Sequence, residues 1–239
     1  MRRALYSMVA VAVMSLVFVG CGAGAKMVVP ADVLTMPSDY LAVTGRSSAS
    51  GSMADESFQL GPYAVSNVNR DWDSTHQVKI WTSSKERTTS GYTYTFAATA
   101  GEMSGGCQVE GNTESVSSFS GRTSMSQTVS KIGCTCQVGD AAVEGVLDSN
   151  NGSEYEGTVR LRDGEMSIKA VYELDGPVMV AGNPSGYRVD SDSVQAAVDV
   201  MHPGRVWLNK ELSETQRDDL SCLFVGLMLY KGPKAKDSF

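Results

Sequence analysis

The side chains best suited to chemistry in this sequence are its five cysteines and two histidines. His76 and His202 lie far apart in the chain, and neither belongs to a recognisable pair of metal ligands. His76 is close to Asp71 and Asp73, so it could serve as a base whose ring an aspartate orients. Catalytic triads are assembled from distant elements, however, so we interpret this segment as a solvated turn and keep a hydrolase that uses His76 as an alternative.

Cys21 follows a segment that is typical of protein export. The chain begins Met1-Arg2-Arg3, and the sixteen residues 4–19 that follow are uncharged. As a helix this run would span about 24 Å, which is less than the ~30 Å of a hydrocarbon layer. A cleaved signal peptide over residues 1–20 is therefore favoured over a permanent membrane span.

The residues that precede Cys21 add a second signal. Residues 16–21 read LVFVGC, which resembles the lipobox of bacterial lipoproteins, with Phe18 where Leu is usual. The resemblance implies that Cys21 is acylated and becomes the new N-terminus, at the start of a lipidated tether over residues 21–37. It places the protein on a bacterial membrane; if the cell is Gram-negative, Gly22 in place of Asp favours the outer membrane.

The other four cysteines predict disulfides, because an even number in an exported chain favours them. Cys134 and Cys136 would share one face of a strand and are poorly placed to bond each other. We expect Cys107 to pair with Cys136, with Cys134 as its second choice. Cys222 lies in an apolar segment, where a buried free thiol is common. No metal site is expected, since only one C-x-C pair accompanies the two separate histidines.

Short alternating segments separated by turns predict a β-rich domain. The turn pairs Asn151-Gly152, Asp163-Gly164 and Asp175-Gly176 favour two-residue hairpins, and they predict an antiparallel meander from Ala141 to Asn209. The Ser-rich segment 112–130 is polar, and we expect it to form an exposed hairpin loop.

The end of the chain breaks this pattern. Ser213 and Gln216 form a capping box, and the stretch Leu220–Tyr230 has no charge and is apolar on all sides, so a helix over about 214–230 must be buried. The predicted fold is mainly β with a C-terminal helix: an antiparallel meander that forms a barrel-like or sandwich sheet around or against that helix. It occupies a single domain, residues 38–232, with a tail at 233–239.

Short motifs are scattered through this domain: 58–65 (FQLGPYAV), 69–72 (NRDW), 186–189 (GYRV), 195–198 (QAAV) and 205–208 (RVWL). Together they look like those of uncharacterised bacterial lipoproteins. The order of elements, a strand-rich body that ends in an apolar helix, resembles the tubby, LURP-one and scramblase-like architecture, a group associated with phosphoinositide or membrane binding. The basic pocket that such binding needs is not visible in the sequence.

Charge and motif content narrow the functional classes. The chain has 27 acidic against 20 basic residues and a pI near 4.9, which disfavours a nucleic-acid partner. The common hydrolase and nucleotide motifs do not occur, so no cofactor is expected. We predict a non-catalytic, lipid-anchored envelope protein that contacts protein, glycan or lipid, with Trp72 as a candidate binding surface because it lies in a polar segment. A lipid-binding module is the alternative.

Overall fold

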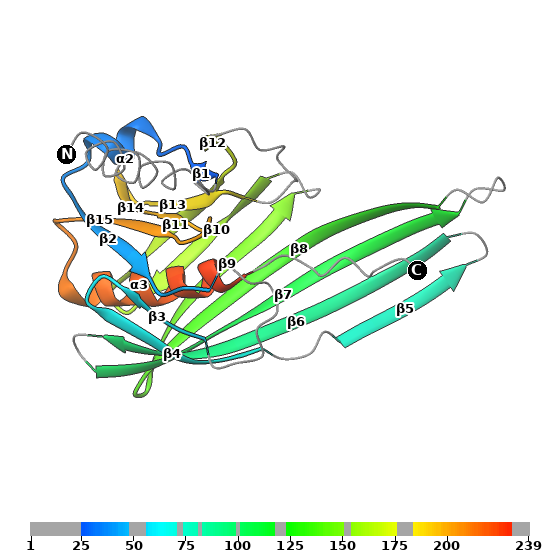
Figure 1. The fold of residues 1–239 in the computed structure, drawn as a ribbon, viewed down its shortest axis with the longest axis horizontal. Helices are drawn as coiled ribbons and strands as arrows, with labels where there is room; N and C mark the ends of the chain where they lie inside the picture. The colour runs from blue at the N-terminus through cyan, green and yellow to red at the C-terminus, as the bar shows by residue number, and fades with distance from the viewer. Residues whose placement is uncertain are drawn as a thin grey trace, which may run out of the picture.

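The computed structural model describes residues 25–47, 56–70, 74–80, 83–98, 101–117, 123–150, 154–175 and 184–230. Side chains are described in the ranges 25–47, 56–70, 89–98, 101–111, 131–149, 154–175 and 184–230. The molecule is elongated, with a rounded body at one end and a group of long strands that extends from it (Figure 1).

Twelve antiparallel strands close into a barrel, and this confirms the β-rich fold expected from the sequence. In chain order they are β2 (Ser38–Thr44), β3 (Glu56–Leu60), β4 (Tyr63–Arg70), β6 (Ser83–Ala98), β7 (Gly101–Ser117), β8 (Thr123–Val138), β9 (Ala141–Asn150), β10 (Glu154–Leu161), β11 (Gly164–Val171), β13 (Gly186–Asp190), β14 (Val194–Asp199) and β15 (Arg205–Asn209). The run from β9 to β15 is the predicted meander. Pairing of β4 with β6 closes the ring.

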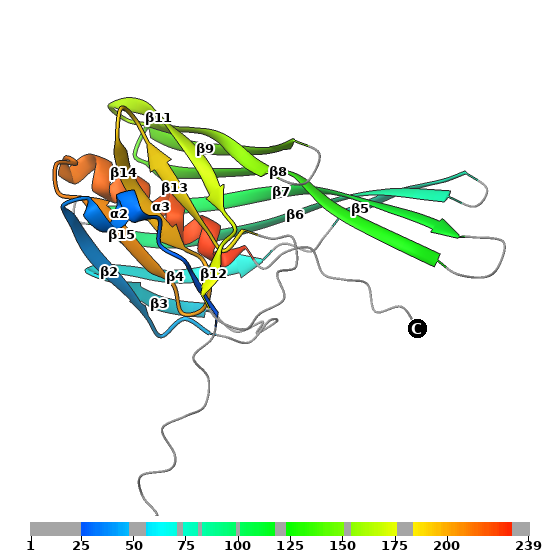
Figure 2. The ribbon, with the colours of Figure 1, turned by 90° about the horizontal axis from the view of Figure 1, so that it is seen from above.

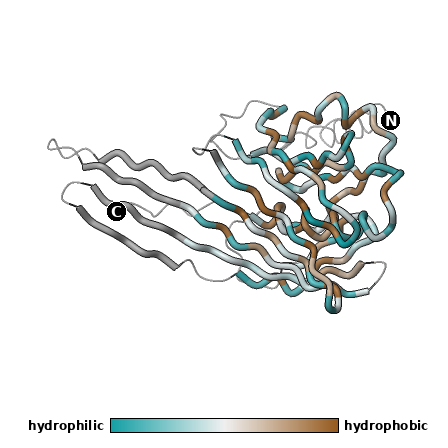
Figure 3. The backbone as a smooth tube through the Cα atoms, turned by 180° about the vertical axis from the view of Figure 1, so that it is seen from behind, coloured by the Kyte–Doolittle hydropathy of each residue, from teal (hydrophilic) through white to brown (hydrophobic). Residues whose placement is uncertain are grey.

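Alternation along the strands separates the barrel wall into an inner and an outer side. In β11 Met166 and Ile168 are buried, while Glu165 and Lys169 on either side of them are exposed. In Figure 3 the barrel strands alternate between apolar and polar segments in the same way. Because successive side chains point to opposite faces of a strand, the inward set forms one continuous apolar surface.

The apolar helix α3 (Glu214–Leu229) occupies the interior of this barrel (Figures 1 and 2). Every residue from Asp218 to Leu229 is buried, and the helix contacts strands on several sides, among them β7, β8, β10 and β15. Its hydrophobic residues have no polar stripe that could face water. The barrel therefore supplies the enclosure that the sequence required of an all-apolar helix.

Three of the barrel strands are much longer than the others. β6, β7 and β8 have 16, 17 and 16 residues, and their far halves pair with one another and with β5 (Ser74–Ile80) beyond the barrel (Figure 1). We call residues 74–80, 83–90, 111–117 and 123–130 the extension. The expectation of a loop over 112–130 was wrong for most of that segment: residues 112–117 and 123–130 continue the β7–β8 ladder through backbone pairing, and Thr is among the residue types enriched in strands.

The N-terminal part of the domain packs on the outside of the barrel. β1 (Lys26–Met27) pairs with β12 (Leu174–Asp175), and the short helix α2 (Ala31–Thr35) lies over β14. Met27 and Val33 are 1% and 0% exposed and form a second small cluster with Ala197 and Trp207. The structure thus differs from the predicted tether over 21–37, because these apolar side chains find partners on the outer wall.

A charge placed on the inner helix should prevent folding. We expect Leu223→Asp or Phe224→Asp to cost several kcal/mol, since each buried side chain would become an unpaired carboxylate among apolar neighbours. Thermal unfolding followed by circular dichroism measures the effect. Leu34→Asp is the matched control, because Leu34 is 67% exposed and should tolerate the same change. Unchanged melting of the Leu223 and Phe224 variants would show that the helix is not enclosed.

Candidate functional site

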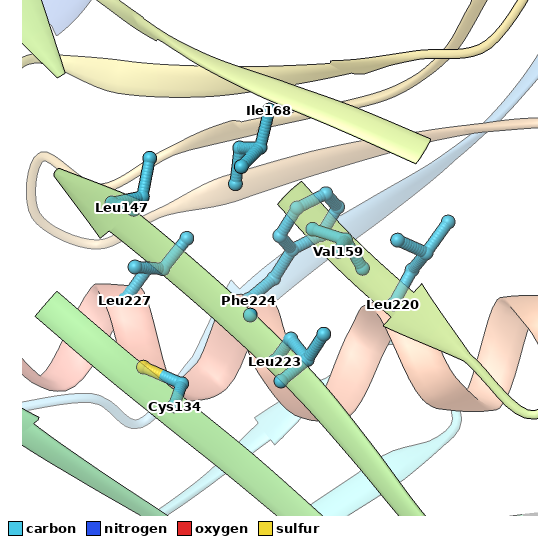
Figure 4. Close-up of a pocket in the computed structure, with 9 residues that line it drawn as sticks. Cys134, Leu147, Val159, Ile168, Leu220, Leu223, Phe224 and Leu227 are labelled. Carbon is cyan, nitrogen blue, oxygen red and sulfur yellow. The ribbon is translucent and has the colours of Figure 1, made fainter. Parts of the chain in front are cut away.

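The barrel interior is taken up by α3 and by the inward side chains of the wall. A small void lies between α3 and strands β8 to β11, and its volume is about 10 Å³ (Figure 4). A water molecule needs about 10–15 Å³ of such space and two or more polar partners. The lining is apolar, as Figure 4 shows for Leu147, Ile168 and Phe224. This void offers no room for a substrate.

Two disulfides lie where α3 meets the wall. Cys107 bonds Cys134 between β7 and β8, and Cys136 bonds Cys222 between β8 and the helix. The disulfides predicted from the cysteine count are thus present in the structure. The second one fastens the central helix to the barrel by a covalent bond.

The pairing differs from the one that the spacing favoured. The β7–β8 register places Cys107 directly opposite Cys134, while Gly105 is opposite Cys136. Cys136 shares a face with Cys134 and points inward, where it bonds the helix residue Cys222, so the predicted Cys107–Cys136 bond and the free thiol at Cys222 were both wrong. Sequence spacing does not give the register of a long hairpin, and the register decides which sulfurs meet.

The two disulfides should contribute unequally to stability. Cys136 and Cys222 are 86 residues apart and Cys107 and Cys134 are 27 apart. A larger closed loop restricts the unfolded chain more, so removal of the longer link should cost about 1 kcal/mol more. Urea unfolding of Cys136→Ala/Cys222→Ala beside Cys107→Ala/Cys134→Ala checks this difference. Equal midpoints, or the reverse order, would contradict it.

Small residues and two tyrosines allow α3 to approach the wall closely. A Cβ atom at Gly226 would lie 2.5 Å from the Cys107 sulfur, and one at Gly105 would lie 2.2 Å from the Tyr94 ring. The Tyr94 hydroxyl donates to the Cys222 carbonyl at 2.8 Å, and Tyr92 donates to Gly226 at 2.6 Å. Burial raises the pKa of both phenols, so they stay neutral hydrogen-bond donors.

A capping box and a buried ion pair hold the start of α3. Ser213 Oγ accepts from the Gln216 amide at 3.2 Å, and the Gln216 side chain accepts from the Ser213 amide at 3.0 Å. Asp219 is fully buried and accepts from Arg162 Nε at 2.8 Å and from Arg162 Nη2 at 2.5 Å. The carboxylate is therefore paired and hydrogen-bonded inside the barrel.

Asp218 lies beside this pair and faces Tyr63. Burial, together with the neighbouring Asp218 carboxylate, raises the pKa of Tyr63 to about 12. The phenol consequently stays protonated at neutral pH. The two aspartates at the start of the helix are thus both held by partners from the barrel wall, and neither stands in an open site.

The buried Arg162–Asp219 pair should stabilise the fold far more than the exposed pairs of Arg160, which lies two residues before Arg162. Arg162→Ala leaves Asp219 charged and buried, and we expect a loss of about 3–5 kcal/mol in the free energy of unfolding. Arg160→Ala is the control, because Arg160 is 67% exposed and its pairs with Glu144 and Glu165 lie in water, where the change should be at most about 1 kcal/mol. Urea titrations of both variants measure the loss in the free energy of unfolding. Similar losses in the two variants would contradict the stabilising role of the buried Arg162–Asp219 pair.

Two arginines cap the other end of α3. Arg70 donates to the Leu229 carbonyl at 2.8 Å and to Glu56 at 3.0 Å, and its guanidinium lies 5.8 Å from the centre of the Tyr92 ring. Arg46 donates to the Met228 carbonyl and to the Val200 carbonyl at 3.1 Å. Positive charge at a helix C-terminus offsets the partial negative charge of its carbonyls. Burial lowers the pKa of Arg46.

Tyrosines surround the same end of the helix. Burial raises the pKa of Tyr187, Tyr230, Tyr155 and Tyr172. The Tyr155 amide donates to the Tyr172 hydroxyl at 3.1 Å. These groups are neutral phenols packed at the end of the barrel, and the arginines beside them are already bonded to helix carbonyls. This arrangement fixes the end of the helix and engages Arg46 and Arg70 within the protein.

The residues that the sequence singled out for function lie mostly outside the described part. Cys21, Trp72, Asp71 and Asp73 fall outside the described residues. His76 lies in β5 of the extension, where its backbone is in register with Arg87, and its side chain is outside the described ranges. Over the described residues, no group of three or more His, Cys, Asp or Glu side chains could hold a metal ion.

A shallow cleft opens on the outer wall between β2 and β3. The two strands pair only at Val43 with Leu60 and at Thr44 with Gln59, and they diverge beyond that point. The cleft has a volume of about 300 Å³, and its lining has no charged side chain: Thr44, Gly45, Ser57, Phe58, Gln59 and Val65. It lacks a base and a cation to orient a substrate.

Two further findings concern membrane-spanning helices and similarity to known proteins. In the described residues, no helix is both long enough and apolar enough to cross a membrane. Comparison with known proteins finds no matching family model, no matching curated protein and no matching solved structure.

Proposed function

We propose that this chain is a lipid-anchored cell-envelope protein whose barrel is a non-catalytic binding or structural domain. The observation that carries the proposal is the filled interior. α3 occupies the space in which a barrel would hold a ligand, and the void beside it is about 10 Å³. Contacts of this protein with other molecules are then made on the outer wall and along the extension.

Two features support the envelope as the location. The lipobox-like residues 16–21 follow a charged start and an apolar run, which is the pattern of exported lipoproteins. The structure contains two disulfides, and disulfides persist in oxidising compartments such as the bacterial periplasm. A diacylated or triacylated Cys21 would provide the two hydrophobic signals that stable anchoring needs.

Metabolic labelling with a fatty-acid probe in a bacterial host tests the anchor. The wild-type chain should incorporate the probe and sediment with membranes, whereas Cys21→Ser should lose both properties. Gly24→Ala is the matched control, because it leaves Cys21 and the residues before it unchanged. A Cys21→Ser protein that still carried the probe and stayed in the membrane fraction would refute the proposal.

A lipid-binding module is the second candidate. A closed barrel around a C-terminal helix fits the tubby-like resemblance, and this is the observation that favours it. Against it, Arg46 and Arg70 bond carbonyls at the end of α3 and Glu56, so they are engaged within the protein. Native mass spectrometry after mild extraction distinguishes the two: a co-purifying lipid beyond the covalent one would support the lipid-binding module.

A further inference from the structure

The exposed large hydrophobic side chains gather on the N-terminal part of the domain. Among the residues whose side chains are described, they are Val28, Leu34 and Tyr40, which are 37%, 67% and 54% exposed. All three lie within fifteen residues of Lys26, where the described, folded chain begins to pair with β12. We call these three residues the N-terminal apolar patch.

The patch lies on one side of the barrel. Val33 of α2 is fully buried in the small outer cluster with Ala197 and Trp207, so its neighbour Leu34 is held on the outer surface above β14. The Tyr40 ring packs beside Trp207, with 5.8 Å between ring centres. Figure 2 looks onto this side, with α2 in front of β13 to β15.

The length of chain before this patch limits where the patch can be. Lys26 is the fifth residue after Cys21, and an extended chain covers at most about 3.6 Å per residue step, or about 18 Å for these five steps. A lipid on Cys21 would hold that end at the membrane surface. Because Met27 is fixed to the barrel, a lipid on Cys21 would hold the β1 end of the N-terminal apolar patch, next to Val28, close to the bilayer.

We propose that Val28, Leu34 and Tyr40 dock this side of the barrel onto the lipid bilayer that holds Cys21, at the boundary between headgroups and acyl chains. This inference rests on the proposed lipid anchor. Exposed apolar and aromatic side chains next to an anchor have a favourable site at that boundary. Lys26 is exposed beside the patch and would meet anionic headgroups there.

The shape of the molecule is compatible with this orientation. In Figure 1 α2 and β1 lie along the top of the barrel, and the extension runs sideways from its end. A bilayer above α2 would therefore leave the polar extension in water. The opposite orientation would separate Lys26 from the membrane by the width of the barrel, which five residues cannot span.

A second copy of the chain is a less favourable occupant. Stable protein interfaces bury about 800 Å² on each partner, with about 20–30 residues a side. The patch offers three exposed apolar side chains, and charged groups surround it, among them Asp32, Asp39 and Lys210. A bilayer needs no matching shape and accepts a small patch that a covalent lipid already holds in place.

A nitroxide label on the full lipidated protein tests the docking. The label is placed at Leu34→Cys, with the native disulfides oxidised, and at Glu102→Cys as the matched control. Glu102 is exposed at the β6–β7 hairpin, across the barrel from α2 in Figure 1. In vesicles of phosphatidylethanolamine and phosphatidylglycerol, the Leu34 label should become more accessible to oxygen than to a water-soluble nickel chelate. The Glu102 label should show the reverse.

Fatty-acid incorporation, measured on the same samples, separates the two proposals. If the protein incorporates the fatty-acid probe but its Leu34 label stays accessible to the nickel chelate, the docking is overturned and the lipid anchor is supported. No incorporation would overturn both. Short distances between Leu34 labels of different molecules would assign the patch to a dimer and also overturn the docking.

A variant without a label at Leu34 provides an independent check. A label at Val28→Cys should be shielded from the nickel chelate in the docked protein. Adding Leu34→Asp should make this label accessible to the chelate, because a carboxylate in the N-terminal apolar patch favours water. Glu102→Gln, far from the patch, should leave the Val28 label shielded. Continued shielding in the Leu34→Asp protein would overturn the docking.

Discussion

The structure depends on the burial of one helix whose last ten residues, Leu220–Leu229, carry no charge and have no polar face. An isolated helix of this kind cannot stay in water, and a single sheet would cover only part of it. Twelve strands around α3 cover it on every side, and they in turn gain a core that a barrel of this size would otherwise lack. Helix and wall are each unstable without the other.

Enclosure creates a second requirement at the helix ends, where backbone groups lack partners within the helix. At the start, Ser213 and Gln216 cap each other, and Arg162 pairs with the buried Asp219. At the far end, Arg46 and Arg70 reach the last carbonyls. The arginines near the core therefore bind backbone carbonyls and a buried carboxylate of α3. This role explains why arginines and tyrosines cluster at the ends of the helix, where they could otherwise suggest a ligand site.

A filled interior moves any recognition to the surface. The barrel offers two distinct surfaces: the outer wall under α2, where the exposed apolar side chains gather, and the polar extension of β5 to β8, whose strands have no second layer over the described residues. The first suits a membrane because it adjoins the predicted anchor. The proposed docking would hold the extension parallel to the membrane and away from it, where it can meet other envelope components.

The sequence alone determined the parts that depend on local pattern. The Asn-Gly and Asp-Gly pairs predicted the meander. The capping box and the uncharged residues that follow it predicted a buried C-terminal helix. Both predictions were possible because turns, caps and periodicity depend on residues close together in the chain. Only the tertiary structure decided the closure of β4 on β6, the pairing of Cys107 with Cys134 and of Cys136 with Cys222, and the docking of Met27 and Val33 on the outer wall. Each of these depends on strand register or on contact between residues far apart in the chain, which no local pattern specifies.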